Sequence, residues 1–146
     1  MKRWPLLNFK NLIMLLPQFN FLVLGGPEDI FCKELEELAP RRVKNLAGEL
    51  SLVESMAIVK ESQLVISADT GIIHVADILE VQGISLIGPT AFGFPTGKHI
   101  KVLETELTCR PCSKDGRGYC SQEVYQKCMV DISPDLVAQN IVNILK

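Results

Sequence analysis

The stretch SADTGIIHVAD, at residues 67–77, places an acid, a hydroxyl, a glycine and a histidine directly after an apolar run. Asp69 falls where a strand is predicted to end, and Thr70 and Gly71 fall where a helix begins. Free backbone amides at a helix N-terminus favour an anion, and Gly71 lacks a side chain that would keep a phosphate away from them. His74 lies one helical turn further on, so its ring is expected to face the same cleft. This pattern favours a phosphate-binding site.

The same residues also fit a purely structural role. In that role Asp69 or Thr70 caps the helix, Gly71 relieves packing, and His74 is buried with its hydrogen bonds satisfied. The stretch contains neither a Walker loop nor a G-x-G-x-x-G fingerprint. The pattern by itself leaves both interpretations open.

Two further strand ends carry residues suited to a ligand. Gly25 and Gly26, in GGPED, let the backbone approach a ligand closely, and Glu28 is placed to accept hydrogen bonds from ribose hydroxyls. The acidic residues of this segment also suit the start of a helix. Thr90, in GPTAFGFPTG, offers a hydroxyl, but the segment equally fits a turn-rich connector. Because ligands bind beyond the carboxyl ends of parallel strands, the three strand ends are expected to form one cleft.

Four of the five cysteines lie in one polar loop at about residues 108–130 and have the spacing C-x2-C-x7-C-x7-C. They are Cys109, Cys112, Cys120 and Cys128. Four thiolates so grouped can bind zinc tetrahedrally and fasten a loop that has little core of its own. The spacing lacks the second C-x2-C pair of common zinc ribbons, so unligated cysteines are the other interpretation. Disulfides are disfavoured in a reducing compartment.

The elements that position these residues are predicted to alternate between strands and helices. Helices are expected over residues 5–16, 28–39, 51–62 and 70–79 and from Ser133–Pro134 onwards, and strands over 21–26, 43–48, 63–67, 83–88 and 100–103. Ser51 and Glu54 have the spacing of a capping box. The apolar strands are continuous rather than alternating, which is typical of a parallel sheet with helices on both faces. The expected fold is a Rossmann-like, doubly wound α/β domain over residues 1–146.

The composition disfavours two classes of protein. A net charge of -2 gives no basic face for nucleic acid. No apolar run reaches the roughly 18 residues that span a bilayer. The N-terminus begins like a signal peptide, with Lys2 and Arg3 before apolar residues, but Asn8 and Lys10 interrupt that run and no cleavage site follows. A cytoplasmic protein is therefore expected, whose apolar N-terminal helix is either largely buried or lies on a membrane surface.

Taken together, the motifs resemble those of glycosyltransferase family 9, the heptosyltransferase family of bacterial lipopolysaccharide core synthesis. The matching segments are KRWP at 2–5, LGGPED at 24–29, NLAGELSLVES at 45–55, ADTGIIHVA at 68–76, LIGPT at 86–90, and CRPC at 109–112 followed by CMVDISPDLV at 128–137. Their order and spacing span nearly the whole chain.

The resemblance implies the C-terminal, donor-binding half of a GT-B enzyme, without the N-terminal half that holds the acceptor. It implies a nucleotide sugar, typically ADP-heptose, as donor and a lipid-linked saccharide as acceptor. Four residues are expected around the donor's sugar and diphosphate: Asp69, Thr70, Gly71 and His74. Lys2 resembles the family's lysine that stabilises the departing diphosphate, and Glu28 is the best match for the acidic residue near the ribose. Asp77, where the family more often has alanine, adds negative charge near the cleft.

The resemblance also implies an inverting mechanism that needs no bound metal, in which cationic groups and a helix terminus neutralise the leaving diphosphate. The expected general base belongs to the N-terminal half, so no catalytic residue is assigned with certainty and the chain alone is expected to lack this group. The other hypothesis is a non-catalytic nucleotide-sugar-binding or interaction module that needs a separate acceptor domain. A face left uncovered by the missing half is a possible cause of dimerisation, and association with the inner face of the cytoplasmic membrane is a further expectation.

Overall fold

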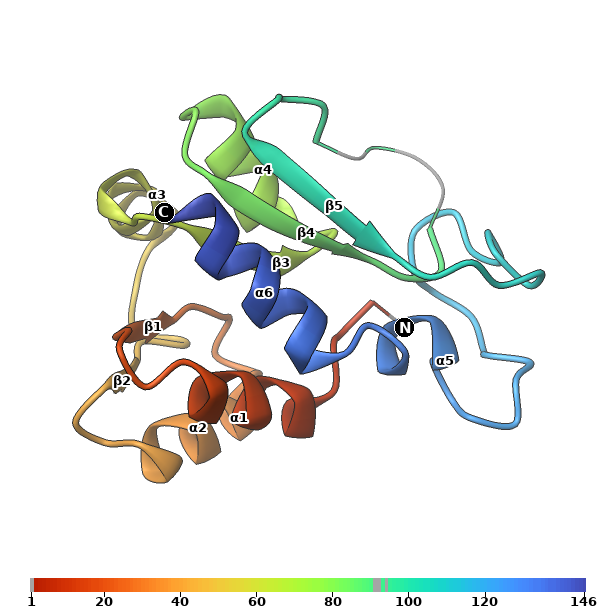
Figure 1. Ribbon diagram of the computed structural model, residues 1–146, viewed down its shortest axis with the longest axis horizontal. Helices are drawn as coiled ribbons and strands as arrows, with labels where there is room; N and C mark the ends of the chain where they lie inside the picture. Colours follow the sequence, from red (N-terminus) through yellow and green to blue (C-terminus); the bar gives the residue numbers. More distant parts are fainter. Residues whose placement is uncertain (1, 91–92, 94) are drawn as a thin grey trace.

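Helices and short parallel strands alternate along the chain in the computed structural model, which describes residues 2–90, 93 and 95–146 (Figure 1). The helices are α1 (Leu6–Leu15), the 3-10 turn η1 (Ile30–Cys32), α2 (Lys33–Leu38), α3 (Leu52–Glu61), α4 (Gly71–Ile78), α5 (Lys127–Val130) and α6 (Pro134–Ile144). The strands are β1 (Phe21–Val23), β2 (Val43–Asn45), β3 (Val65–Ala68), β4 (Gly83–Ile87) and β5 (Ile100–Glu104). Residues 91, 92 and 94 of the predicted Gly/Pro-rich connector lie outside the described residues.

The strand pairs are all parallel, and the predicted α/β fold class is confirmed. β1 pairs with β2, and β4 lies between β3 and β5. In the described part of the chain the strands thus form a two-stranded and a three-stranded sheet rather than the one sheet expected. β1 and β2 are shorter than predicted because Gly25 and Gly26 follow the first, and a turn in which the Ala47 N–H donates to the Asn45 side chain at 3.1 Å ends the second.

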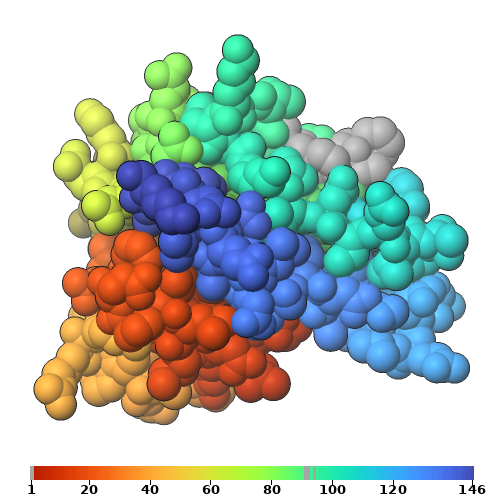
Figure 2. Space-filling model, in the orientation of Figure 1, coloured from red at the N-terminus to blue at the C-terminus, as the bar shows by residue number. Residues whose placement is uncertain are grey.

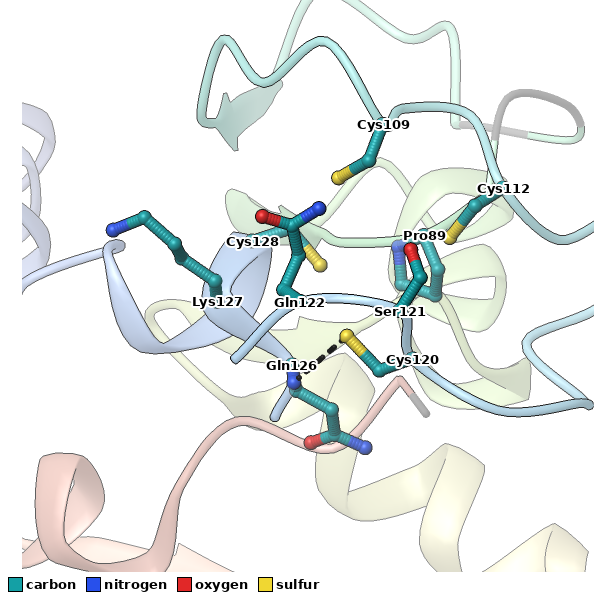
Figure 3. Close-up of a pocket in the computed structure, with 9 residues that line it drawn as sticks. All are labelled: Pro89, Cys109, Cys112, Cys120, Ser121, Gln122, Gln126, Lys127 and Cys128. Carbon is teal, nitrogen blue, oxygen red and sulfur yellow. Dashed lines mark hydrogen bonds between the residues drawn. The ribbon is translucent and has the colours of Figure 1, made fainter. Parts of the chain in front are cut away.

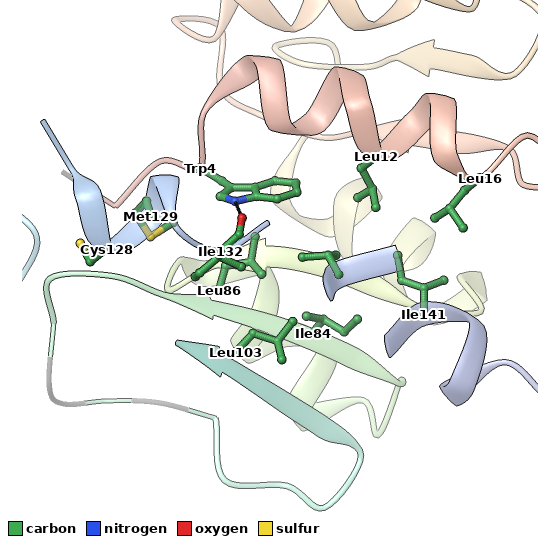
Figure 4. Packing of buried hydrophobic residues seen from close by; sticks show 11 residues of the cluster. Trp4, Leu12, Leu16, Ile84, Leu86, Leu103, Cys128, Met129, Ile132 and Ile141 are labelled. Atoms are coloured by element: carbon green, nitrogen blue, oxygen red, sulfur yellow. Dashed lines mark hydrogen bonds between the residues drawn. The ribbon is translucent and has the colours of Figure 1, made fainter. Parts of the chain in front are cut away.

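The three-stranded sheet has a hydrophobic core on each face. Ile84 and Leu86 of β4 pack with α1 and α6 on one face, and the opposite face packs against α3 and α4 through a second cluster that includes Val65 and Ile73 (Figures 1 and 4). All five residues of β4 are buried, which explains its continuous apolar sequence. The arrangement is the doubly wound one that the sequence predicts.

Most predicted helices are present to within about two residues. Ser51 and Glu54 form the predicted capping box, and the Ser133 hydroxyl caps α6 at Leu136. The helix predicted over residues 28–39 is instead a 3-10 turn followed by a six-residue α-helix. The four-residue α5 was not predicted, because one turn of helix leaves no periodic pattern in the sequence.

Trp4 fixes the path of the N-terminal segment. Its side chain is completely buried, its Nε1–H donates to the Ile132 carbonyl oxygen at 2.9 Å, and its ring meets the Phe9 ring edge-on at 4.8 Å (Figure 4). This anchor holds the two preceding cations, Lys2 and Arg3, in a defined place beside the sheet.

The loop that carries the four cysteines projects from one side of the molecule, where it forms the cyan to light-blue edge of the surface (Figure 2). Within the described residues, no helix combines the length and apolar character required to cross a membrane.

Candidate functional site

The Asp69 carboxylate is the centre of a polar cluster at the carboxyl end of the three-stranded sheet. Its Oδ2 accepts hydrogen bonds from Lys2 Nζ at 3.3 Å and from Thr90 Oγ1 at 3.1 Å, and its Oδ1 lies 3.4 Å from His74 Nε2. Asp69 is 8% exposed and Thr90 only 1%. Four of the residues singled out in the sequence therefore meet at one point, and we call them the Asp69 cluster.

The register of the sheet explains this convergence. Ala68, the last residue of β3, lies opposite Leu86 of β4, so the residues that follow the two parallel strands emerge side by side. Asp69 comes directly after β3, and Thr90 follows β4 by three residues. The β3–α4 turn then brings the His74 ring back over the same carboxylate. The rule that ligand sites form beyond the carboxyl ends of parallel strands correctly predicted that the loops after β3 and β4 meet.

The start of α4 is open to an anion. Thr70 is the N-cap residue by position but makes no capping hydrogen bond, because its hydroxyl bonds Ser67 Oγ at 2.8 Å instead. Gly71 is exposed, and a Cβ placed on it would have no heavy atom within 4 Å. The interpretation in which Thr70 caps the helix is therefore wrong. The first turn of α4 presents backbone N–H groups without a side-chain cap, which is the arrangement that binds phosphate.

The glycine pair after β1 lies on the other side of the N-terminal segment. The Gly26 N–H donates to Asp29 Oδ2 at 3.0 Å, and the same carboxylate pairs with Arg3 at 3.5 Å. Gly25 and Glu28 are exposed, and the Glu28 carboxylate fills the space that a side chain at Gly26 would take. Glu28 thus lies at this strand end but makes none of the contacts that its neighbour Asp29 makes.

Lys2 and Arg3 connect the two strand ends. Lys2 reaches Asp69 after β3, and Arg3 reaches Asp29 after β1. The Arg3 guanidinium also lies 4.0 Å from the centre of the Phe31 ring, a cation–π contact. The sequence motifs did not single out Arg3 or Asp29 as site residues, although Arg3 lies next to a predicted phosphate ligand and Asp29 is one residue from Glu28.

An open hollow of about 550 Å³ lies beside these cations. It is lined by Lys2, Arg3, Gly116, Tyr125 and Gln126. Gly116 packs directly on the Lys2 side chain, so closely that a Cβ at Gly116 would clash with the Lys2 methylenes. The cysteine-bearing loop therefore forms a wall of the site, an association that the sequence did not predict.

Asp77 does not lie in this cleft. Its carboxylate pairs with His99 at 3.2 Å and accepts hydrogen bonds from the Thr96 and Gly97 N–H groups at 3.3 and 3.1 Å. It lies at the opposite end of α4 from Gly71, and the partners of its carboxylate belong to the segment before β5. The expectation that Asp77 adds negative charge to the phosphate site is therefore wrong.

The four loop cysteines line one small cavity of about 10 Å³ beside Pro89, and their thiols are free (Figure 3). Burial raises the pKa of the Cys128 thiol, whereas backbone N–H groups, led by that of Gln122, lower the pKa of the Cys120 thiol. Among the described residues, no three His, Cys, Asp or Glu side chains are already arranged to hold a metal ion. The structural zinc site, one of the two interpretations of the spacing, remains a prediction.

Alternating helices and parallel strands, with helices packed on both faces of the three-stranded sheet, define a Rossmann-like α/β domain. The chain belongs to glycosyltransferase family 9 (heptosyltransferase), whose sequence model matches residues 1–121. This finding confirms the family resemblance of the motifs.

Relatives and solved structures agree with this assignment. The chain is 25% identical to lipooligosaccharide heptosyltransferase 2 of Campylobacter jejuni, covering 99% of this chain and 47% of that protein. It is 26% identical to the protein of the same name from Haemophilus ducreyi, covering 99% and 44%. The chain thus spans about half the length of the curated relatives it matches.

The fold matches one part of solved GT-B heptosyltransferases. The structure of E. coli ADP-heptose lps heptosyltransferase II superimposes with a TM-score of 0.80 at 23% identity, covering 99% of this chain and 42% of that one. A heptosyltransferase from E. coli with ADP-2-deoxy-2-fluoro heptose gives a TM-score of 0.73 at 24% identity, covering 97% and 39%.

Proposed function

We propose that these 146 residues are the donor-binding domain of an inverting glycosyltransferase that transfers a heptose from ADP-heptose, or a closely similar nucleotide sugar, to a lipopolysaccharide-type acceptor. The observation that carries this proposal is the Asp69 cluster beside the uncapped start of α4. Relatives named heptosyltransferases, and a similar fold solved with an ADP-heptose analogue, support the choice of donor.

The anionic part of the donor is matched by Lys2 and the first turn of α4. The Lys2 side chain is 30% exposed, so its ammonium can turn from Asp69 to a phosphate without leaving a buried position. The Gly71 N–H and its neighbours add the partial positive charge of the helix N-terminus. Together they neutralise the charge that grows on the diphosphate as it departs.

The groups around this anion site bind the sugar and the nucleoside of the donor. Asp69 accepts hydrogen bonds from sugar hydroxyls, while Thr90 and His74 hold its carboxylate in orientation. The exposed backbone at Gly25, the first residue of the Gly25–Gly26 pair, is placed to meet the nucleoside, and the exposed Glu28 is placed to accept from ribose hydroxyls. The cationic hollow beside Lys2 gives the donor a path to the cluster.

The reaction proposed is a single displacement. The acceptor oxygen bonds to the anomeric carbon as the bond from that carbon to the diphosphate oxygen breaks, and the diphosphate leaves with the electron pair. A base removes the acceptor's proton. Asp69 and His74 are engaged with each other on the donor side, so we propose that the base comes from an acceptor-binding half outside these residues. The domain alone then binds donor with little or no transfer.

A pair of matched substitutions tests the donor site. Asp69 and Asp77 are both aspartates paired with a histidine, one before and one within α4. Asp69→Asn is expected to weaken ADP-heptose binding about 10- to 100-fold in calorimetry, the worth of a hydrogen bond to a charged group. Asp77→Asn is expected to leave the affinity unchanged.

Equal affinity of the two variants, with circular dichroism showing both folded, would contradict the proposed site. Transfer activity of the isolated chain would contradict the proposed location of the base but not the donor site. Peripheral association with the cytoplasmic membrane and dimerisation remain predictions, which vesicle sedimentation and light scattering test.

A further inference from the structure

The loop between β5 and α5 has almost no core. Between Thr108 and Lys127 the only buried residue is the glycine Gly116, and no helix or strand forms over this stretch. Leu107 before the stretch and Cys128 after it belong to the main hydrophobic cluster. A loop of this length needs cross-links to hold one conformation, since burial contributes so little to it.

Two of the cysteine-bearing segments are anchored at the ends of the neighbouring strands β4 and β5. The Cys112 N–H donates to the Pro89 carbonyl oxygen at 3.1 Å, and Arg110 Nε donates to the Gly88 carbonyl oxygen at 2.6 Å. From the other side, Cys128 is buried against the main core, and its carbonyl oxygen accepts from Thr105 Oγ1 at 3.1 Å. The backbone thus brings the first cysteine pair to the last cysteine without help from the loop itself.

The third segment closes the cavity. Cys120 Sγ accepts a hydrogen bond from the Gln126 N–H at 3.3 Å, and Gln126 has a left-handed backbone with φ 56°. The four side chains enter the same space from three separate segments (Figure 3).

The volume of this cavity and its four sulfur ligands indicate which ion it can bind. A cavity of about 10 Å³ accommodates one water-sized sphere. Four sulfur ligands around a single small site suit zinc, which binds thiolates tetrahedrally at about 2.3 Å.

We propose that Cys109, Cys112, Cys120 and Cys128 bind one structural zinc ion, which cross-links the loop to the end of β4 and to α5. Each thiol releases its proton to solvent on binding, and its side chain rotates inward, because the four thiols are not yet arranged as a ligand set in the described residues. The zinc ion takes no part in the proposed sugar transfer. Gln126 lines both this cavity and the donor hollow, and Gly116 and Tyr125 of the same loop also line the hollow.

Metal content decides this proposal. The chain is purified under reducing conditions from zinc-supplemented cells without a metal-affinity step, and its zinc is measured by elemental analysis. The expected value is about one ion per chain. Cys112→Ser, at an exposed thiol, is expected to lower zinc affinity by at least about tenfold against a competing chelator. Cys32→Ser, outside the cavity, is the control and is expected to keep the ion.

Cobalt titration of the unmodified chain keeps the test decisive if Cys112→Ser fails to fold. One equivalent is expected to give the absorption bands of tetrahedral cobalt thiolate and to protect the four loop thiols from a thiol reagent. Zinc-free protein that takes up no cobalt, or a disulfide between any two of the four cysteines in the reduced preparation, would overturn the proposal. Equal loss of zinc in the Cys32→Ser control would do the same.

Discussion

The Asp69 cluster and the four-cysteine loop are both polar regions at the end of the same sheet, but different forces hold them in place. Asp69 and Thr90 are themselves buried and follow two paired strands that have hydrophobic cores on both faces. The loop has a single buried residue, Gly116, between Thr108 and Lys127. The first region therefore inherits its geometry from the fold, whereas the second depends on contacts made by its own side chains.

The proposed donor site combines the two regions. The groups proposed to meet the phosphate follow strand ends and begin a helix, where packed secondary structure holds them. One wall of the hollow beside them belongs to the loop, for which a zinc cross-link is proposed. Lys2 belongs to both, since it pairs with Asp69 and packs under Gly116.

The largest effect is expected from the anchor of the N-terminal segment. Trp4→Ala removes a fully buried indole and its hydrogen bond to Ile132, which is expected to cost about 3–5 kcal/mol of unfolding free energy in urea denaturation. Trp4→Phe keeps most of the volume and loses the N–H, so a loss of about 1–3 kcal/mol is expected. If both variants were as stable as the unmodified chain, the fold that holds the Asp69 cluster would not depend on this anchor.

A local effect is expected from removing the proposed zinc ion. With a strong chelator, hydrogen exchange of the amides over residues 109–128 is expected to accelerate by about tenfold or more, because the loop loses its cross-link while β3 and α4 keep their hydrogen bonds. Mass spectrometry of peptides from the two regions measures both at once. Equal acceleration in β3 would show that the two regions form one cooperative unit.

The smallest effect is expected far from both regions. Ser51→Ala breaks the capping box of α3 and is expected to lower the unfolding free energy by about 1 kcal/mol, without changing donor affinity or zinc content. This variant is a control for the predictions on donor binding and zinc content. If Ser51→Ala changed donor affinity, the affinity would depend on the overall stability of the domain rather than on the donor site.

The sequence predicted the Asp69 cluster well. Continuous apolar strands, capping residues and the rule that ligands bind at strand ends were enough to place Asp69 and Thr90 together, 21 residues apart in the chain. These are signals of local structure, and parallel pairing converts them into proximity. Asp77 was misplaced because comparison with the family's motif does not reveal its partners: it lies at the other end of α4 and pairs with His99.

The remaining contacts depend on the path of irregular segments, which leaves no periodic trace in the sequence. Trp4 bonds Ile132 across 128 positions, and Gly116 meets Lys2 only because the loop folds back over the N-terminus. Arg3 and Asp29 were similarly missed, since their pairing depends on how the segment after β1 turns. The division into two sheets also follows from such turns, which end β1 and β2 after three residues each.

The most direct test of the donor site is calorimetric titration of ADP-heptose into the chain and two lysine variants. Lys2 and Lys10 are both 30% exposed and both paired with a carboxylate, but only Lys2 lies at the strand ends. The original chain and Lys10→Met are expected to bind equally, and Lys2→Met about 10- to 100-fold more weakly. Equal binding by Lys2→Met, or no binding by the folded original chain, would contradict the assignment of this site to the donor diphosphate.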